Sequence, residues 1–416
     1  MAKKDYVIRV LASPLDVDAA SWNTLLASQT PHEAPSPFMR HEYLVAMHAS
    51  SSAVTKTGWT PRFLTLWQGD MLAGACALYL KTHSYGEYVF DMAWANAYSQ
   101  HGLAYYPKAL IAPPFTPVPG PRLLARNADE RLLLAQAAIN WCREQKLSSL
   151  HLLFGSDADL AACEKAGLML RHNVQFHWSN RAPGTETDSA QVSASPAGFR
   201  DFDDFLMSLN QDKRKKIRQE RRKVADAGIR FRWSLGTDIS DADWDFFYRC
   251  YERTYYEHGN APYLTRDFFT RMQRSMPGNW LLFVAEHSGP DGGRTAVAAS
   301  LIAVSETLLG ADAQARVAYG RYWGALARVD CLHFEACYYQ PLQWCIDHGY
   351  QRFEGGAQGE HKMARALLPV KTSSAHWLAH PSFADAVERF LEREGAGIDG
   401  YLENLEKRSP LRQGPG

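Results

Sequence analysis

An internal repeat constrains the fold of this chain more than any other feature of its sequence. Asn140-Trp141-Cys142 matches Gln343-Trp344-Cys345, and His177-Trp178 matches His376-Trp377. The two matches occur in the same order, at nearly the same separation, and between similar predicted elements. Self-similarity at a fixed spacing is the signature of a repeated architecture. We therefore predict two copies of one α/β unit, in each of which helices flank a mixed, twisted sheet.

The hydrophobic pattern of each copy predicts a pair of strands, then a helix and a strand, and finally a late strand. A single helix within 334–348 has to kink at Pro341, because proline cannot donate the backbone hydrogen bond that a helix interior requires. An aromatic, proline-rich section at 85–122 is expected to form strand ends and loops that line a cleft. The predicted elements are strands 62–67 and 72–81, helix 130–146, strand 149–154, helix 158–166 and strand 174–178 in the first copy, and strands 280–286 and 295–304, helix 334–348, strand 352–354 and strand 375–378 in the second.

The composition between the copies changes twice. Residues 183–198 are rich in Ser, Thr, Ala and Gly, which is typical of a linker. Residues 199–230 contain a strongly basic segment. The predicted organisation is an N-terminal unit at 1–182, the linker, the basic helix region, and a C-terminal unit at 231–416.

The basic segment is predicted to be a helix that ends at Gly228. Eight of the eleven residues from Lys213 to Lys223 are Lys or Arg. One interpretation is a solvated helix face that is neutralised by the acidic residues at 201–204. The other is capture of a phosphate-bearing partner, such as a tRNA acceptor end, a nucleotide-linked or lipid-linked intermediate, or an anionic membrane surface. The sequence leaves both open.

The length, net charge and cysteine content of the whole chain limit the classes of protein to which it can belong. A chain of 416 residues exceeds one ordinary core, and its zero net charge argues against a general nucleic-acid coat. The N-terminus lacks the apolar run of a secretory signal, and no apolar stretch is long enough for a membrane-spanning helix, so we expect a cytoplasmic protein. Seven scattered cysteines without a C-x-x-C pair predict reduced thiols and no structural zinc.

The densest group of chemically active residues lies at 353–362, followed by Arg365. Three glycines allow a close backbone approach to a ligand, and carboxylates, an amide, an imidazole and an amine stand beside them. The alternative is a polar surface loop. The repeat places Glu354, Gln358, Glu360, His361 and Lys362 opposite His151, Gly155, Asp157, Ala158 and Asp159. The polar set therefore occurs only in the second copy, and we expect the chemistry there.

Several motifs resemble one known family. They are Tyr105-Tyr106-Pro107-Lys108, Pro114-Phe115-Thr116-Pro117-Val118, Gly120 and Arg122 in the first copy, and Tyr319-Gly320-Arg321-Tyr322-Trp323-Gly324, His333-Phe334-Glu335-Ala336-Cys337-Tyr338-Tyr339 and Gly356-Ala357-Gln358-Gly359-Glu360-His361-Lys362 in the second. With these, the chain resembles the FemAB-like branch of the GNAT acyltransferase superfamily over roughly residues 20–410. One departure is Arg365-Ala366-Leu367, where the family pattern has Arg-Gly-Phe.

The resemblance implies tandem GNAT-like units and transfer of an activated acyl or aminoacyl group to an amine, in a cell-wall context and without a cofactor. Superfamily members that use acetyl-CoA hold its pyrophosphate with a glycine-rich turn at a helix N-terminus. Here the corresponding turn, 325–330, contains no glycine. This favours a bulkier donor such as an aminoacyl-tRNA, with an acyl-CoA donor as the alternative.

The mechanism requires a base for the ammonium group, donors for the oxyanion and cations for donor phosphates. We predict Glu354 or Glu360 as the base and His361 as a relay or second base. Tyr319 and Tyr322 are candidates for returning a proton to the leaving group, and backbone amides near Gly320 or Gly324 are expected to face the oxyanion. The predicted donor-binding residues are Lys362, Arg365, Arg321, Tyr322, Gln358, Lys213, Arg214 and Lys216.

Two other functions remain open at this level. Metal-dependent hydrolysis would use His333, Glu335, Glu354 and His361, but their spacing matches no known metal motif. For His333 and Glu335, capping of a helix N-terminus is as good an explanation as catalysis. A non-catalytic module would instead bind cell-wall or nucleic-acid fragments through the basic helix and the aromatic section.

Overall fold

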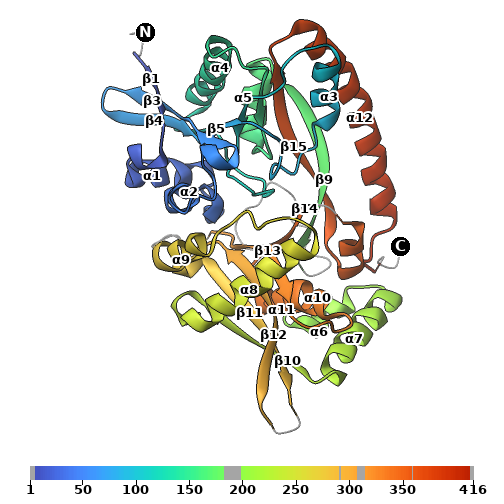
Figure 1. The fold of residues 1–416 in the computed structure, drawn as a ribbon. Coiled ribbons are helices and arrows are strands. Elements are labelled where there is room, and N and C mark those ends of the chain that lie inside the picture. The colour runs from blue at the N-terminus through green and yellow to red at the C-terminus, as the bar shows by residue number, and fades with distance from the viewer. Residues whose placement is uncertain (1–4, 182–197, 290–291, 307–313, 358, 413–416) are drawn as a thin grey trace.

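The structure is a computed structural model that describes residues 5–181, 198–289, 292–306, 314–357 and 359–412 (Figure 1). The predicted linker lies outside these residues, apart from Gly198. The described residues form one sheet of eleven strands and a second sheet of four, with helices packed around both. None of the helices in these ranges is long and apolar enough to cross a membrane.

Helices and strands alternate along the whole described chain. The first half contains β1 (Val7–Leu11), α1 (Ala19–Gln29), α2 (His41–Ala49), β2 (Trp59–Pro61), β3 (Phe63–Gln68), β4 (Met71–Cys76), β5 (Leu78–Lys81), α3 (Met92–Gln100), β6 (Lys108–Ile111), β7 (Leu124–Ala125), α4 (Ala128–Glu144), β8 (Ser149–Leu152), α5 (Asp157–Lys165) and β9 (Met169–Ser179). The second half contains α6 (Phe202–Met207), α7 (Gln211–Asp226), β10 (Ile229–Leu235), α8 (Asp241–Glu257), α9 (Arg266–Ser275), β11 (Trp280–Ser288), β12 (Arg294–Val304), β13 (Val317–Ala325), α10 (Leu332–Phe334), α11 (Gln340–Asp347), β14 (Arg352–Ala357), β15 (Leu368–Leu378) and α12 (Pro381–Lys407).

The two halves exchange their last strands. The large sheet has the order β10-β11-β12-β13-β14-β9-β15-β8-β6-β5-β2. β9, from the first half, pairs with β14 and β15 of the second half, and β15 pairs with β8 of the first. The sheet is therefore continuous across both halves, and α12 covers the exchanged pair (Figure 1).

The register of these strands follows the correspondence found in the sequence. Glu354 on β14 lies opposite His177 on β9. His151 on β8 lies opposite His376 on β15. The repeat matches Glu354 with His151 and His177 with His376, so each of these pairs is the counterpart of the other. Each half therefore places the position that the repeat matches, Glu354 or His151, opposite the histidine of an exchanged strand.

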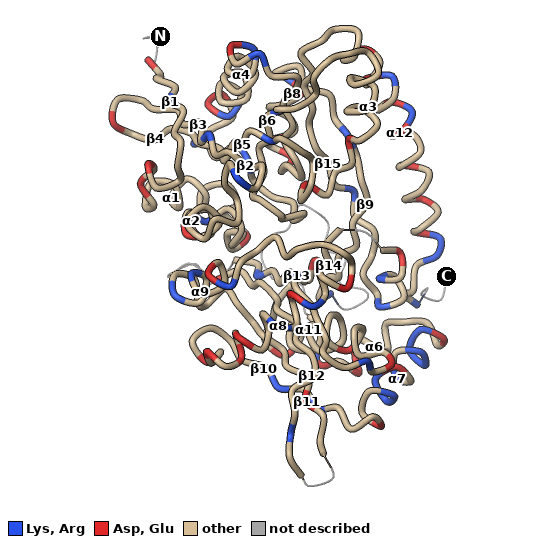
Figure 2. Tube along the Cα trace, viewed as in Figure 1, with Lys and Arg blue, Asp and Glu red and all other residues tan. Residues whose placement is uncertain are grey.

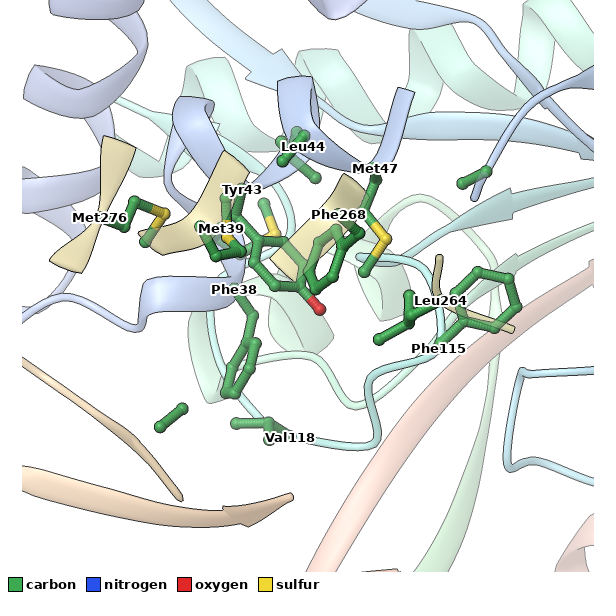
Figure 3. Close-up of a cluster of buried hydrophobic side chains, with 14 of the residues drawn as sticks. Phe38, Met39, Tyr43, Leu44, Met47, Phe115, Val118, Leu264, Phe268 and Met276 are labelled. Carbon is green, nitrogen blue, oxygen red and sulfur yellow. The ribbon is translucent and has the colours of Figure 1, made fainter. Parts of the chain in front are cut away.

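A shared hydrophobic core joins the halves. It includes Phe38 and Tyr43 from the first half and Phe268 and Tyr319 from the second, all fully buried. The Tyr43 ring packs edge-on against Phe38 and Phe268, and Phe38 packs edge-on against Tyr319. Figure 3 shows several of these side chains meeting between α2 and α9. Because this core is continuous, the two halves are packed against each other through buried side chains.

Two predicted elements differ from the structure. The aromatic section at 85–122 contains a helix, α3, and a strand, β6, whereas only strand ends and loops were expected. The helix forms because Met92–Gln100 has three alanines and no proline or glycine. The predicted strand at 72–81 is divided at Ala77, because β4 belongs to the four-stranded sheet and β5 to the large one.

The expected kink at Pro341 takes the form of a π turn. Residues Glu335–Tyr339 form this turn between α10 and α11, and Pro341 lies in the first turn of α11. The π turn runs into α11 without a break, since Tyr339 and Gln340 have helical φ and ψ. The extra residue of the π turn accommodates the proline, which has no N–H to bond to the preceding turn. π turns are rare and frequently mark functional regions.

Candidate functional site

The parallel strands β13 and β14 run side by side and then diverge. Val317–Tyr319 pair with Arg352–Glu354, and no further pair between the two strands occurs in the described part of the chain. The next residues on each strand, Gly320–Tyr322 and Gly355–Ala357, line a common cavity. Backbone N–H and C=O groups that lose their partner strand are free to bind a ligand. The divergence therefore opens the sheet at the sequence segments expected to carry the chemistry.

The cavity has a volume of about 1040 Å³ and lies between the two halves. Its wall from the first half consists of residues 83–86 and 88–92 with Tyr106 and Pro117. Its wall from the second half consists of Tyr255, His258, Asn260 and Tyr263 with the two strand segments. A concave space of this size at an interface between units is typical of a small-molecule site. The predicted cleft along 85–122 is thus present, with a wall that the second half completes.

Glu354 lies where the strands diverge, directly before the cavity-lining residues Gly355–Ala357, and is not itself among the residues that line the cavity. Its Oε1 accepts a hydrogen bond from Arg352 Nε at 3.0 Å, and Arg352 also holds Glu33 with two hydrogen bonds of 2.8 and 2.9 Å. Its Oε2 is buried and has no partner in the described structure. Burial raises the pKa of Glu354, although Arg352 and Arg122 oppose the shift. An unpaired carboxylate oxygen with a raised pKa is suited to accept a proton.

Of the two candidate tyrosines, only Tyr322 lines the cavity. Tyr319 lies beside Glu354 on β13, but it is 1% exposed and packs in the shared core. The Tyr322 hydroxyl is buried and has no hydrogen-bond partner in the described ranges. Of the glycines expected near the oxyanion, Gly320 lines the cavity. Gly324 instead packs against α8, where a Cβ would lie 1.9 Å from the Cys250 carbonyl oxygen.

Lys362 forms hydrogen bonds to the backbone at the end of β14. Its ammonium group donates hydrogen bonds to the carbonyl oxygens of Gly356 and Ala357, at 3.0 and 3.3 Å. The side chain is buried, and burial lowers the pKa of Lys362 to about 8. Gly356 itself has a φ of +76°, which glycine adopts without strain. Lys362 therefore fixes the backbone that lines the cavity.

The remaining residues of the polar stretch do not converge on Glu354. Glu360 is exposed and accepts hydrogen bonds from Tyr401 and Arg408 of the α12 region, at 2.6 and 3.3 Å. His361 Nε2 lies 3.4 Å from the Tyr338 hydroxyl, and burial lowers the pKa of His361. Gln358 lies outside the described residues.

Arg365 is engaged by α7. Its guanidinium donates to both oxygens of Glu220, at 3.0 and 3.1 Å, and lies 3.5 Å from the centre of the Phe334 ring. The Tyr339 hydroxyl also donates to Glu220. Both charged side chains are almost fully buried. This geometry gives Arg365 a structural partner in place of the donor phosphate predicted for it.

We expect Arg365→Met to lower the free energy of unfolding by about 3–5 kcal/mol, because it leaves Glu220 buried without a counter-charge. Adding Glu220→Gln should restore much of that loss. Urea unfolding measures both, and Lys223→Met, which removes the exposed ion pair with Asp330, serves as the control with an expected loss below about 1 kcal/mol. Equal losses in the single and double variants would contradict this structural role.

Arg321 stands on the cavity wall without a carboxylate partner among the described residues. Its Nη2 donates to the Phe115 carbonyl oxygen at 2.6 Å, whereas Nε is buried and unpaired. The guanidinium lies over the rings of Phe38 and Tyr322, at 5.2 and 5.1 Å. Aromatic faces stabilise the cation without neutralising it. Arg321 thus presents a positive charge with free donors to the cavity.

The basic helix α7 has two different faces. Its inner face packs Ile217 and Val224 into the fold, while Arg221 pairs with Glu335 at 3.1 Å. On its outer face, Lys215, Lys216 and Arg222 are exposed and have no acidic partner in the described structure. Lys213, half-buried on the side of Ile217, has none there either, and Arg214 donates a hydrogen bond to Met207 Sδ. Lys and Arg are concentrated along this helix (Figure 2). The interpretation as a neutralised face describes Arg218, Arg221 and Lys223, which form ion pairs, and capture of a phosphate-bearing partner stays a prediction.

The first half contributes a buried ionic cluster that the sequence did not reveal. Lys108 donates to Glu87 at 2.7 Å and to Asp91, and Lys81 lies 4.0 Å from Glu87. All four side chains are almost inaccessible to solvent. Lys81 and Lys108 occupy strand ends next to apolar residues, which was the available signal. Asp91 lines the cavity, so the cluster forms part of its wall.

Asp91 is linked to a chain of buried polar groups. The Tyr105 hydroxyl donates to Asp91 at 2.6 Å and lies 3.1 Å from His151, which in turn contacts His376 through the two Nδ1 atoms at 2.7 Å. Burial alone would raise the pKa of Asp91, but the Lys108 ammonium and the Tyr105 hydroxyl hold that pKa well below its usual range. Asp91 is accordingly a stable anion at the cavity wall.

The acidic residues considered for a metal-dependent hydrolase form ion pairs with arginines. Glu335 pairs with Arg221, and Glu354 with Arg352. No group of three or more His, Cys, Asp or Glu side chains in the described ranges is placed to hold a metal ion.

The chain matches the family model for FemAB-like proteins of peptidoglycan biosynthesis and recognition over residues 13–413. The crystal structure of FemX is similar to it, with a TM-score of 0.52, 10% identity, and coverage of 89% of this chain and 98% of FemX. Among curated proteins, no significant sequence match was found.

Two further solved structures are similar to the chain over most of its length. The C-terminal domain of a putative lysylphosphatidylglycerol synthetase from Agrobacterium fabrum has a TM-score of 0.49 and 10% identity, and covers 90% of this chain and 96% of its own. A tandem GNAT protein from the clavulanic acid biosynthesis pathway has a TM-score of 0.43 and 12% identity, and covers 91% of this chain and 99% of its own. The predicted α/β fold class is confirmed, and the chain belongs to the FemAB-like family of peptidoglycan biosynthesis and recognition proteins.

Proposed function

We propose that this protein transfers an activated acyl or aminoacyl group to an amine in peptidoglycan metabolism, in the cavity between its halves. The observation that carries the proposal is the divergence of β13 and β14 beside a buried, partly unpaired carboxylate. Backbone groups near Gly320 and Gly355 would bind the acyl carbonyl, which is where negative charge develops during the reaction. Membership of the FemAB-like family supports this reaction class.

In the proposed reaction, Glu354 accepts a proton from the ammonium group of the acceptor, directly or through one water. The freed nitrogen lone pair attacks the acyl carbon, and a C–N bond forms. The bond between that carbon and the donor oxygen or sulfur breaks, and the leaving group takes up a proton. Tyr322 is the proposed relay for that proton: it donates its hydroxyl proton to the leaving group and takes up the second proton that the nitrogen releases as the amide forms. It is suited to this role because Tyr322 lines the cavity and its buried hydroxyl has no partner in the described structure.

The donor is proposed to be an aminoacyl-tRNA, with acyl-CoA as the alternative. The outer face of α7 supports tRNA, since its unpaired cations match a phosphate backbone. An acyl-CoA would need a different phosphate site, because the turn after β13, at 325–330, contains no glycine. Native mass spectrometry with acyl-CoA and charged tRNA pools separates the two donors.

Reversal of four charges on α7 tests this choice of donor. The variant carries Lys213→Glu, Lys215→Glu, Lys216→Glu and Arg222→Glu, and we expect it to bind charged tRNA at least about tenfold more weakly. The control reverses Lys56, Lys146, Lys165 and Lys407, four exposed lysines on other elements, so the net charge changes equally. Equal weakening in both variants, or retention of acyl-CoA alone by the wild type, would contradict a tRNA donor.

A further inference from the structure

The cavity carries one fixed charge of each sign, on walls that belong to different halves. Asp91, at the N-terminus of α3, contributes the negative charge, and Arg321 on β13 contributes the positive charge. Both side chains line the same cavity. Neither forms an ion pair with the other in the structure. A ligand that enters this space therefore meets a carboxylate on one side and a guanidinium on the other.

Asp91 has binding capacity that its protein partners do not use. Its Oδ2 accepts hydrogen bonds from Lys108 and Tyr105. Its Oδ1 is buried and has no partner in the described ranges, although the residue is only 3% exposed. An unsatisfied carboxylate oxygen at a buried position costs free energy unless a donor reaches it. Lys108 already supplies the counter-charge, so the group still missing is a hydrogen-bond donor, and a primary ammonium group supplies three.

Arg321 has unused capacity of the opposite kind. The Phe115 carbonyl occupies one of its donors, and Nε is buried without an acceptor. The surrounding aromatic rings provide no negative charge. With Nη2 engaged and Nε buried, Nη1 remains to donate a charge-assisted hydrogen bond to a carboxylate. The free donors and the missing counter-charge both specify an anionic group on the ligand.

From these two observations we infer that the acceptor is a zwitterion: a free amino acid or short peptide whose ammonium group binds Asp91 and whose carboxylate binds Arg321. This deepens the proposed function, on which it rests, by naming the chemistry of the acceptor. It also assigns Arg321 to the acceptor rather than to donor phosphates. The acyl group would approach from the diverging strands, beside the bound ammonium.

Binding in the absence of any donor tests this inference. Isothermal titration with L-lysine, L-lysinamide, cadaverine and the dipeptide D-alanyl-D-alanine compares ligands with and without a carboxylate. We expect L-lysine or the dipeptide to bind at least about tenfold more tightly than either carboxylate-free amine, because loss of one charge-assisted contact costs that much. The stronger of the two zwitterions distinguishes a free amino acid from a peptide.

Two variants assign the contacts. In Arg321→Gln, which keeps a donor for the Phe115 carbonyl, L-lysine and L-lysinamide should bind equally. In Asp91→Asn, where Lys108 retains Glu87, binding of L-lysine should fall at least about tenfold. Asp399→Asn and Arg271→Gln alter exposed ion pairs elsewhere and should keep the wild-type preference. If a variant does not fold, the ligand series on the wild type still decides.

The inference is overturned if neither zwitterion binds, or if carboxylate-free amines bind the wild type as tightly as zwitterions. A separate turnover assay keeps this outcome distinct from failure of the proposed function. Acyl transfer to cadaverine without any preference for a carboxylate would leave the transferase intact and refute the zwitterion. Zwitterion binding without transfer from any donor would support the zwitterionic ligand and contradict the transferase.

Discussion

Glu354→Gln is expected to lower turnover by about 100-fold or more, the usual effect of losing a general base. The amide cannot take a proton from the acceptor, while its size matches the carboxyl group. The fold should persist, because Arg352 keeps its two hydrogen bonds to Glu33. Steady-state kinetics measures the loss, and circular dichroism with urea unfolding checks the fold. Glu257→Gln, on the exposed end of α8, is the control.

The pH dependence of this variant gives a second readout. The folded-state pKa of Glu354 is raised, so the folded protein holds its proton more tightly than the unfolded chain does. Stability from this group is therefore present at low pH and is lost as the pH rises above the ordinary carboxyl range. We expect the wild type to lose this contribution on going from acidic to neutral pH and Glu354→Gln to lack it.

A large loss of turnover in Glu360→Gln with full activity in Glu354→Gln would place the base at Glu360 instead.

Lys108→Met is expected to lower the free energy of unfolding by about 3–5 kcal/mol, because both Glu87 and Asp91 would then lie buried without their main counter-charge. Lys81 provides little compensation, since it lies 4.0 Å from Glu87 and burial lowers its own pKa to about 7. Urea unfolding at neutral pH measures the loss.

Lys371→Met is the matched control, because its partner Asp399 is exposed and the pair is expected to contribute less than about 1 kcal/mol. The double variant Lys108→Met with Asp91→Asn should recover part of the stability, since it removes one of the unpaired charges. A stability loss in Lys108→Met no larger than that of the control would show that the cluster is solvated and does not form a packed wall of the cavity.

The sequence predicted strands at 174–178 and 375–378 but could not predict how they pair. His177-Trp178 and His376-Trp377 do lie on strands, β9 and β15. Their exchange between the halves depends on long-range pairing that local patterns do not contain. The helix α3 was missed because neighbouring prolines and aromatic residues dominated the interpretation of its section, although Met92–Gln100 itself contains none of the usual helix breakers.

The candidate site was predicted in part for a similar reason. Glycines and Glu354 at the end of a strand indicated the opening in the second half, and the structure places a cavity there. The polar residues of the first half are spread over Lys81, Glu87, Asp91 and Lys108, so no dense segment drew attention to them. By contrast, the dense segment at 353–365 suggested that all of its polar residues belong to one site, but the side chains of Glu360 and Arg365 contact α12 and α7.

The most direct test of the central claim is a crystal structure of the protein with an unreactive donor analogue, either a thioether of acyl-CoA or an amide-linked aminoacyl-adenosine that mimics the end of a charged tRNA. We predict that the acyl group lies between Gly320 and Gly355, with its carbonyl oxygen within hydrogen-bond distance of the backbone and its carbon facing Asp91. An acyl group bound outside the cavity, for example only along α7, would contradict the account.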